Sequence, residues 1–236
     1  MALPKIQSPT FEVIIPSINK TVLFRPFLVK EEKILLMAQQ SNDDKDIIKA
    51  IKQVINNCCL DDKLDIDKLA TFDLEYLFLK LRARSVNNVV EILYKDAEDE
   101  KEYKFTIDLD DVEVTMPKKS EKNIKINKKS GIIMKYPNLS IVDQMKDFKN
   151  EMDFLNFFII KCIDEIYDEN EVYPAADQTD EELQEFIDNL DVKTFDKIKE
   201  FMENMPKLEH VITYTNSLGK EKKITLSTLN DFFTLG

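Results

Sequence analysis

The chain has 236 residues, of which 43% are hydrophobic and 33% are charged, and its formal net charge is −12. This apolar content is enough to build a core, so the composition excludes a wholly disordered chain. A length of 236 residues predicts one large domain or two smaller ones. The acidic balance argues against non-specific binding to the phosphate backbone of nucleic acids.

The negative charge is concentrated in one segment. Residues 164–191 contain twelve Asp and Glu residues and no Lys or Arg. Because the whole chain has 45 acidic and 33 basic residues, the rest of it carries 33 of each sign. A neutral body with one acidic segment is compatible with a basic protein partner.

Cysteine usage and hydropathy indicate an intracellular protein. Cys58, Cys59 and Cys162 do not form the paired framework of a small secreted domain. The densest apolar run, 154–160, is far shorter than the ~18 residues needed to cross a membrane. The N-terminus also lacks the apolar core of a signal peptide. We therefore expect no membrane partner and a reducing compartment.

The N-terminal third predicts a hairpin followed by three helices. Two β-rich runs, 11–15 and 21–25, should pair with each other, because they flank a turn that contains proline. A helix is expected over 29–39, where two glutamates occupy the opening turn and complement the helix dipole. Further helices are expected over 43–57 and 66–85, because apolar residues recur there at helical spacing.

The middle of the chain is β-like. Residues 89–94 and 102–107 flank a charged loop and predict a second hairpin, which 112–114 extends. The segment 118–134 alternates lysines with isoleucines around a Ser-Gly step, and predicts a lysine-faced hairpin. Lysines of this kind typically protect a solvated sheet edge. A nucleic-acid-binding strand face would also need interleaved aromatic residues, and only Tyr136 follows.

The remainder returns to helix and ends in a hairpin. Residues 151–167 carry a wide apolar stripe that includes Cys162, Ile163 and Ile166, which predicts one helix buried on several sides. The expected elements are helices over 141–148, 151–167, 180–190 and 195–205, strands over 208–215 and 222–226, and a last short helix over 229–233.

These elements together predict an α+β fold. We expect a mainly helical body with several β-hairpins, namely an N-terminal arm, central hairpins, and a C-terminal hairpin with its short helix. The expected divisions are 1–117 (β-arm, helical bundle and hairpin), 118–137 (lysine-rich hairpin or linker) and 138–236 (helical region with C-terminal hairpin and helix). The sequence leaves open whether these form one continuous domain.

Common catalytic and cofactor-binding motifs are missing from the sequence. With three glycines, neither a phosphate-binding loop nor a dinucleotide fingerprint can be formed. No Cys/His cluster has the spacing of a zinc site, and Asp108, Asp110 and Asp111 lack the ligand spacing of a calcium loop. The lone His210 is interpreted as a surface or rim residue. We therefore expect no catalytic residues, no cofactor and no metal.

Two groups of residues are candidates for contacts with a partner protein. Arginine and aromatic side chains often anchor interfaces, and an amphipathic acidic helix can dock into a partner's groove. The alternative is that the phenylalanines belong to the core and the glutamates to a solvated surface. The candidate residues are Phe24, Arg25, Phe27, Phe232 and Phe233 in the first group, and Glu181, Glu182 and Glu185 in the second.

Four stretches of the chain resemble one known family. They are LPKIQSPTFEVIIPS (3–17), FRPFLVKEEKILLMA (24–38), FDLEYLFLKLRARSV (72–86) and MPKLEHVITYTNSLGKEKKITLSTLNDFF (205–233). Together they resemble the T4-type bacteriophage baseplate hub protein family of contractile-tailed phages. The resemblance implies a non-enzymatic structural or assembly protein whose partners are other baseplate and hub proteins. It implies the host cytoplasm as the place of assembly and the virion tail baseplate as the location of a resident subunit.

Three other functions stay open. The first is a tail or hub assembly chaperone that is absent from the mature virion, since an acidic segment is compatible with shielding a basic partner. A nucleic-acid-binding accessory protein is less favoured and predicts salt-sensitive binding through the lysines of 118–129. A carboxylate-based hydrolase is also less favoured, and predicts a pocket that holds acids of strongly raised pKa.

Overall fold

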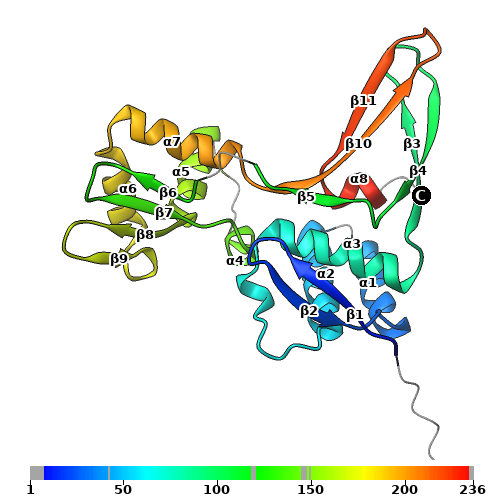
Figure 1. Cartoon of the computed structure of the whole chain (residues 1–236), viewed down its shortest axis with the longest axis horizontal. Helices are drawn as coiled ribbons and strands as arrows, with labels where there is room; N and C mark the ends of the chain where they lie inside the picture. Colours follow the sequence, from blue (N-terminus) through cyan, green and yellow to red (C-terminus); the bar gives the residue numbers. More distant parts are fainter. Residues whose placement is uncertain (1–7, 42, 118–120, 145–147, 149, 234–236) are drawn as a thin grey trace, which may run out of the picture. The chain divides into compact units, whose positions relative to one another are not determined.

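The computed structural model describes residues 8–41, 43–117, 121–144, 148 and 150–233 (Figure 1). By its internal contacts the chain divides into two compact units. The first unit combines Met1–Thr115 with Lys207–Gly236, and the second is Met116–Pro206. Each unit has a hydrophobic core built from its own residues.

Helices and hairpins alternate in the first unit. Its elements are β1 (Phe11–Ile15), β2 (Lys20–Phe24), α1 (Val29–Ser41), α2 (Asp44–Cys58), the 3-10 helix η1 (Ile66–Lys68), α3 (Thr71–Ser85), β3 (Val89–Lys95), β4 (Glu102–Asp108), β5 (Glu113–Thr115), β10 (Lys207–Thr215), β11 (Glu221–Leu226) and α8 (Leu229–Phe233). The predicted N-terminal, central and C-terminal hairpins are confirmed, as are the helices that begin at 29 and near 43.

The N-terminal hairpin shows why this sequence forms strands. β1 and β2 pair antiparallel, with Phe11 opposite Phe24. Alternate residues of both strands point inward, so that Val13, Val22 and Phe24 are buried while their neighbours are exposed. This period of two is the pattern expected of a half-buried strand.

The helix predicted over 66–85 is interrupted. η1 and α3 are separated by Leu69 and Ala70, which are extended. Asp65 accepts a hydrogen bond from the N–H of Asp67, and Asp73 accepts one from the N–H of Ala70. Aspartate side chains that bind nearby N–H groups favour helix starts over a continuous helix, so the segment begins two helices instead of one.

The C-terminal segment returns to the first unit through β10. This strand is the centre of a three-stranded sheet in the order β11-β10-β5. Thr115 lies opposite Lys207, and Val114 lies opposite Leu208. The expectation that 112–114 extends the central hairpin was therefore wrong, because β3 and β4 form a separate two-stranded sheet.

The second unit consists of a small sheet and helices. Its elements are β6 (Asn123–Lys125), β7 (Gly131–Met134), α4 (Leu139–Asp143), α5 (Glu151–Lys161), β8 (Ile163–Tyr167), β9 (Val172–Pro174), the 3-10 helix η2 (Ala175–Asp177), α6 (Asp180–Asp188) and α7 (Val192–Glu203). The four strands form a sheet in the order β6-β7-β8-β9, and each neighbouring pair is antiparallel. The lysine-faced hairpin is present as β6 and β7; Lys118 and Lys119 lie outside the described residues.

The helix predicted over 151–167 was wrong in its second half. α5 ends at Lys161, Cys162 caps it, and β8 follows immediately. In β8 Ile166 lies opposite Ile132 of β7, so the isoleucines of this stretch complete a sheet. β-Branched side chains pack well in strands, and the long apolar run could not by itself distinguish strand from helix.

The fold is mixed α+β, as expected, but a mainly helical body is not confirmed, because the described structure is 41% helical and 28% strand. The two compact units also differ from the expected ranges, since residues 207–236 belong to the same unit as the N-terminal part. Whether any of these ranges folds separately stays a prediction. Among the described residues, no helix has the length and apolarity needed to span a bilayer.

Candidate interaction site

The segment from Phe24 to Phe27 lies inside the first unit. Phe24 has no exposed surface, and its ring stacks on Phe11 with 6.3 Å between centroids. Phe27 is buried, and its backbone N–H donates to Oγ of Ser85 at 2.9 Å. Both phenylalanines therefore pack as core residues, and their role in partner contacts stays a prediction.

Arg25 is held by groups of its own unit. Its guanidinium donates to Oε1 of Glu31 and to the backbone carbonyl of Asn57, both at 2.9 Å. Glu31 has no exposed surface and also accepts the N–H of Leu28. Burial raises the pKa of Glu31, but the hydrogen bonds from Arg25 and Leu28 outweigh it and hold that pKa below its ordinary value. The sequence marked Glu31 only as a helix-dipole residue.

Phe232 lies in the core of the first unit. It is 2% exposed and belongs to the cluster that contains Leu79, Ile107 and Leu208. The side chain of Phe233 lies outside the described residues. Like Phe24 and Phe27, Phe232 therefore packs against its own chain in this structure.

The three candidate glutamates belong to α6 but do not share one face. Glu182 closes a capping box: its Oε2 accepts the N–H of Thr179 at 2.8 Å, and its own N–H donates to the Thr179 hydroxyl at 3.2 Å. Glu181 and Glu185 lie one turn apart on another side of α6, where they line a shallow hollow shared with Phe157 of α5. Only Glu182 faces the groove described next.

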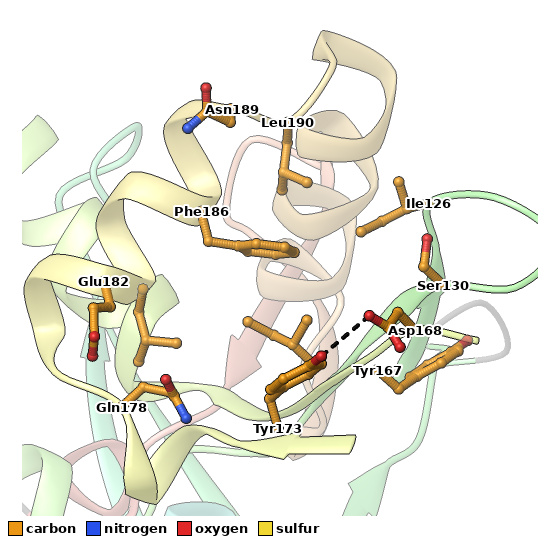
Figure 2. A pocket seen from close by; sticks show the side chains of 12 residues that line it. Ile126, Ser130, Tyr167, Asp168, Tyr173, Gln178, Glu182, Phe186, Asn189 and Leu190 are labelled. Atoms are coloured by element: carbon orange, nitrogen blue, oxygen red, sulfur yellow. Dashed lines mark hydrogen bonds between the residues drawn. The ribbon is translucent and has the colours of Figure 1, made fainter. Parts of the chain in front are cut away.

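A groove of about 510 Å³ lies between α6 and the strands of the second unit (Figure 2). Its apolar floor comes from the turn after β6, from β8, from α6 and from the turn that follows α6. The floor residues are Ile126, Ile166, Leu183, Phe186 and Leu190. The polar residues around the floor are Ser130, Tyr167, Asp168, Tyr173, Gln178, Glu182 and Asn189.

The groove has a carboxylate on each side. Figure 2 shows Phe186 pointing into the groove between Glu182 and Asp168. Asp168 accepts the N–H groups of Asn170 and Glu171 and the hydroxyl of Tyr173, at 2.8, 3.0 and 3.2 Å. These bonds lower the pKa of Asp168, and the capping bonds from Thr179 lower the pKa of Glu182. Both groups are therefore ionised at neutral pH.

This chemistry suits binding more than acid–base catalysis. A carboxylate-based hydrolase needs acids of raised pKa in its pocket, whereas the pKa values of Asp168 and Glu182 are lowered. Among the described carboxylic acids, a clearly raised pKa belongs to Glu75 of the first unit, where burial and the nearby Asp231 raise it to about 7. Within the described residues, no group of His, Cys, Asp and Glu is placed to hold a metal ion.

Part of the lysine-rich segment is engaged with the acidic segment of the same unit. Lys129 forms an ion pair with Glu169, and the ammonium of Lys122 lies 4.2 Å from the ring centroid of Tyr136. These contacts fit a surface lysine face that is partly neutralised by its neighbours.

The sequence predicts α6 but not the other wall of the groove. Phe186 and Leu190 belong to the predicted amphipathic stripe of 180–190. Asp168 and Tyr173 come together only because β8 and β9 pair around a short turn. The Asp-x-Asn sequence at 168–170 is a turn signal that points to this bend, but no local pattern predicts its proximity to α6.

Comparisons with known proteins identify the family of the chain. No curated protein and no solved structure gives a significant match. A family model described as T4 bacteriophage base plate protein matches residues 8–234, which is nearly the whole chain. The resemblance noted in the sequence is thereby confirmed at the level of the baseplate. The chain belongs to the T4 bacteriophage base plate protein family.

Proposed function

We propose that this protein is a non-enzymatic component or assembly factor of the central hub of a phage tail baseplate. It acts through contacts with other baseplate proteins. Membership in the baseplate family over residues 8–234 supports the baseplate part of this proposal. The observation that carries the mode of action is the groove of the second unit, which combines an apolar floor with two ionised carboxylates.

The first experiment tests the location of the protein. Quantitative mass spectrometry of tails purified from infected cells measures its copy number relative to other baseplate proteins. Stoichiometric presence supports a resident hub subunit in the virion. If the gene is required for tail assembly but the protein is absent from purified tails, the result supports the alternative, a chaperone that acts in the host cytoplasm and then leaves.

The chaperone alternative is favoured by one feature, the acidic segment of 164–191. A strongly acidic surface can shield a basic, aggregation-prone partner until that partner is assembled. A chaperone is expected to keep its partner soluble when the two are co-expressed, and to release it on assembly. A partner that stays equally soluble without this protein would argue against that role.

Charge reversal in α6 tests the partner contacts. We expect replacement of Glu181, Glu182 and Glu185 by Lys to weaken the recovery of baseplate partners in a pull-down from infected cells. Since Glu182 also caps α6, circular dichroism has to show that the variant is folded. Unchanged recovery by a folded variant would assign the three glutamates to solvated surface.

A further inference from the structure

The groove between α6 and the sheet of the second unit has the chemistry of a receptor for a short basic segment. We propose that it binds a segment of another baseplate protein that presents one or two apolar side chains flanked by lysine or arginine. This inference rests on the proposed function, because it names the chemistry of the partner at that site.

The floor of the groove supplies the apolar contact. Leu183 is 4% exposed and anchors α6 in the core, whereas Ile126, Ile166, Phe186 and Leu190 are only partly buried. These four therefore leave apolar surface at the bottom of a hollow. A volume of about 510 Å³ lies within the range of about 300–1,000 Å³ that is typical of small-molecule pockets, so it has room for one or two side chains of a partner. Anchor side chains that fill such a pocket supply most of the affinity of many interfaces.

The rim of the groove supplies the charge. Asp168 and Glu182 are each fixed by hydrogen bonds from backbone N–H groups, so their carboxylates are held in place before any partner binds. In the described part of the chain, neither carboxylate forms an ion pair with a lysine or arginine. A cationic partner can therefore pair with both without displacing an existing ion pair.

The surroundings of the groove select the sign of the partner. Asp168 and Glu182 belong to the segment 164–191, which has twelve acidic residues and no basic ones. Residues 121–130, which border the groove on its other side, carry four lysines and one glutamate, so the two segments together stay negative. This field attracts cationic segments and repels nucleic acids and anionic membranes. A second copy of the chain carries the same net charge of −12, which disfavours self-association at this acidic surface. Charge complementarity thus favours a basic segment of a different protein.

Binding of labelled peptides to the full chain tests this inference. The probe is a fluorescein-labelled peptide with a central Leu-Phe pair flanked by three lysines on each side. One control peptide replaces Leu-Phe by Ser-Ser, and the other replaces the lysines by glutamates. We expect saturable binding of the probe in fluorescence polarisation at physiological salt, and at least tenfold weaker binding of both controls. Equal binding of the Ser-Ser peptide, or no binding of the probe at millimolar protein concentration, would overturn the proposal.

Two matched double variants locate the binding site. D168N/E182Q removes both groove charges, while the amide oxygens can still accept the backbone N–H groups of residues 170, 171 and 179. It should weaken probe binding at least tenfold. E181Q/E185Q removes two charges from another side of the same helix, and should weaken it less than threefold. Equal losses would show that the acidic surface binds the probe without the groove, which overturns this inference and leaves the proposed hub function standing.

Sedimentation of the full chain separates a second copy from a foreign partner. We expect the wild-type protein and D168N/E182Q to show the same oligomeric state at micromolar concentration. Self-association that D168N/E182Q abolishes would reassign the groove to contacts between copies and overturn the proposal. The proposed hub function is tested independently, by mass spectrometry of purified tails.

Discussion

At the scale of single residues, Glu31 is a charged side chain that is buried in the first unit. Its carboxylate is fully buried and is neutralised by Arg25 at 2.9 Å, with a further contact from Lys30 at 3.4 Å. Arg25 in turn donates to the carbonyl of Asn57 near the end of α2. The pair therefore ties β2, α1 and α2 together. Removing one partner would leave the other charge buried and without compensation.

We expect Glu31→Gln to destabilise the protein by about 3 kcal/mol at pH 7, the low end for a buried pair because Arg25 keeps 15% of its side chain exposed. The pKa of Glu31 is lowered in the folded state. Its contribution is therefore present above the unfolded-state pKa, about 4.3, and is lost as the pH falls through the folded-state value. Urea denaturation at pH 7 and below pH 4 measures both effects. Glu32→Gln, an exposed neighbour in the same turn, is the matched control, and equal stability of the two variants would contradict this account.

The cysteines should differ sharply in reactivity. Burial raises the pKa of Cys58 to about 11 and that of Cys162 to about 12, whereas Cys59 is only half-buried and its pKa rises less. Because the thiolate is the reactive form, labelling of Cys58 and Cys162 at pH 8 should be at least a hundredfold slower in the native protein than in urea. Time-resolved labelling followed by mass spectrometry checks this, with Cys59→Ser removing the faster site. Rapid native labelling of all three thiols would contradict it.

At the scale of elements, two hairpins distant in the sequence are joined by polar contacts. The hydroxyl of Tyr214 in β10 donates to Asp96 after β3 at 2.6 Å, and Asp96 is 3% exposed. The N–H of Ser217 donates to Asp99 at 2.9 Å. The ring of Tyr214 also lies 4.9 Å from the ring of Tyr103. A two-stranded hairpin is only marginally stable alone, so these contacts stabilise β3 and β4.

We expect Tyr214→Phe to lower the melting temperature by several degrees, because buried Asp96 loses its side-chain donor. The same loss raises the pKa of Asp96, which the Tyr214 hydroxyl holds below its ordinary value. Thermal denaturation followed by circular dichroism measures the first effect. Tyr94→Phe is the control: its ring packs against Tyr214 with 6.2 Å between centroids, and its hydroxyl has no hydrogen bond to a described residue. Equal melting temperatures of the two variants would show that the hydrogen bond contributes little.

At the scale of the whole molecule, the second unit is inserted into the first. The chain leaves the first unit at Thr115 and returns at Lys207, and these two residues are paired in the antiparallel sheet. The core clusters are separate: one is built from residues of 124–205 and the other from residues of 76–114 and 208–232. A paired exit and return means that the insertion closes like a long hairpin loop.

We expect a chain in which 116–206 is replaced by Asn-Gly to fold as the first unit alone. Thr115 lies opposite Lys207, and a two-residue Asn-Gly turn is suited to connecting paired antiparallel strands. Cooperative thermal unfolding and well-dispersed amide signals in an NMR spectrum would confirm independent folding. A second version with a ten-residue Gly/Ser linker controls for strain in the turn. If both versions lack a cooperative transition, the first unit depends on the inserted one.

The sequence by itself determined most of the local structure and the charge distribution. Strand and helix periods predicted the hairpins at 11–24, 89–108 and 207–226 and the helix α6, because these patterns depend on neighbours within one turn or one strand. It also located the acidic segment of 164–191 and carried the resemblance that the family match confirms.

Only the tertiary structure decided which elements meet. It paired β5 with β10 across more than ninety residues, made 163–167 a strand, and placed Phe24, Phe27 and Phe232 in the core. It also brought Asp168 and Glu182 to one groove while turning Glu181 and Glu185 away from it. The physical reason is that an apolar or a charged run indicates only whether its side chains will be buried or exposed to solvent. Which partner covers it is set by long-range pairing and packing, which leave no local pattern in the sequence.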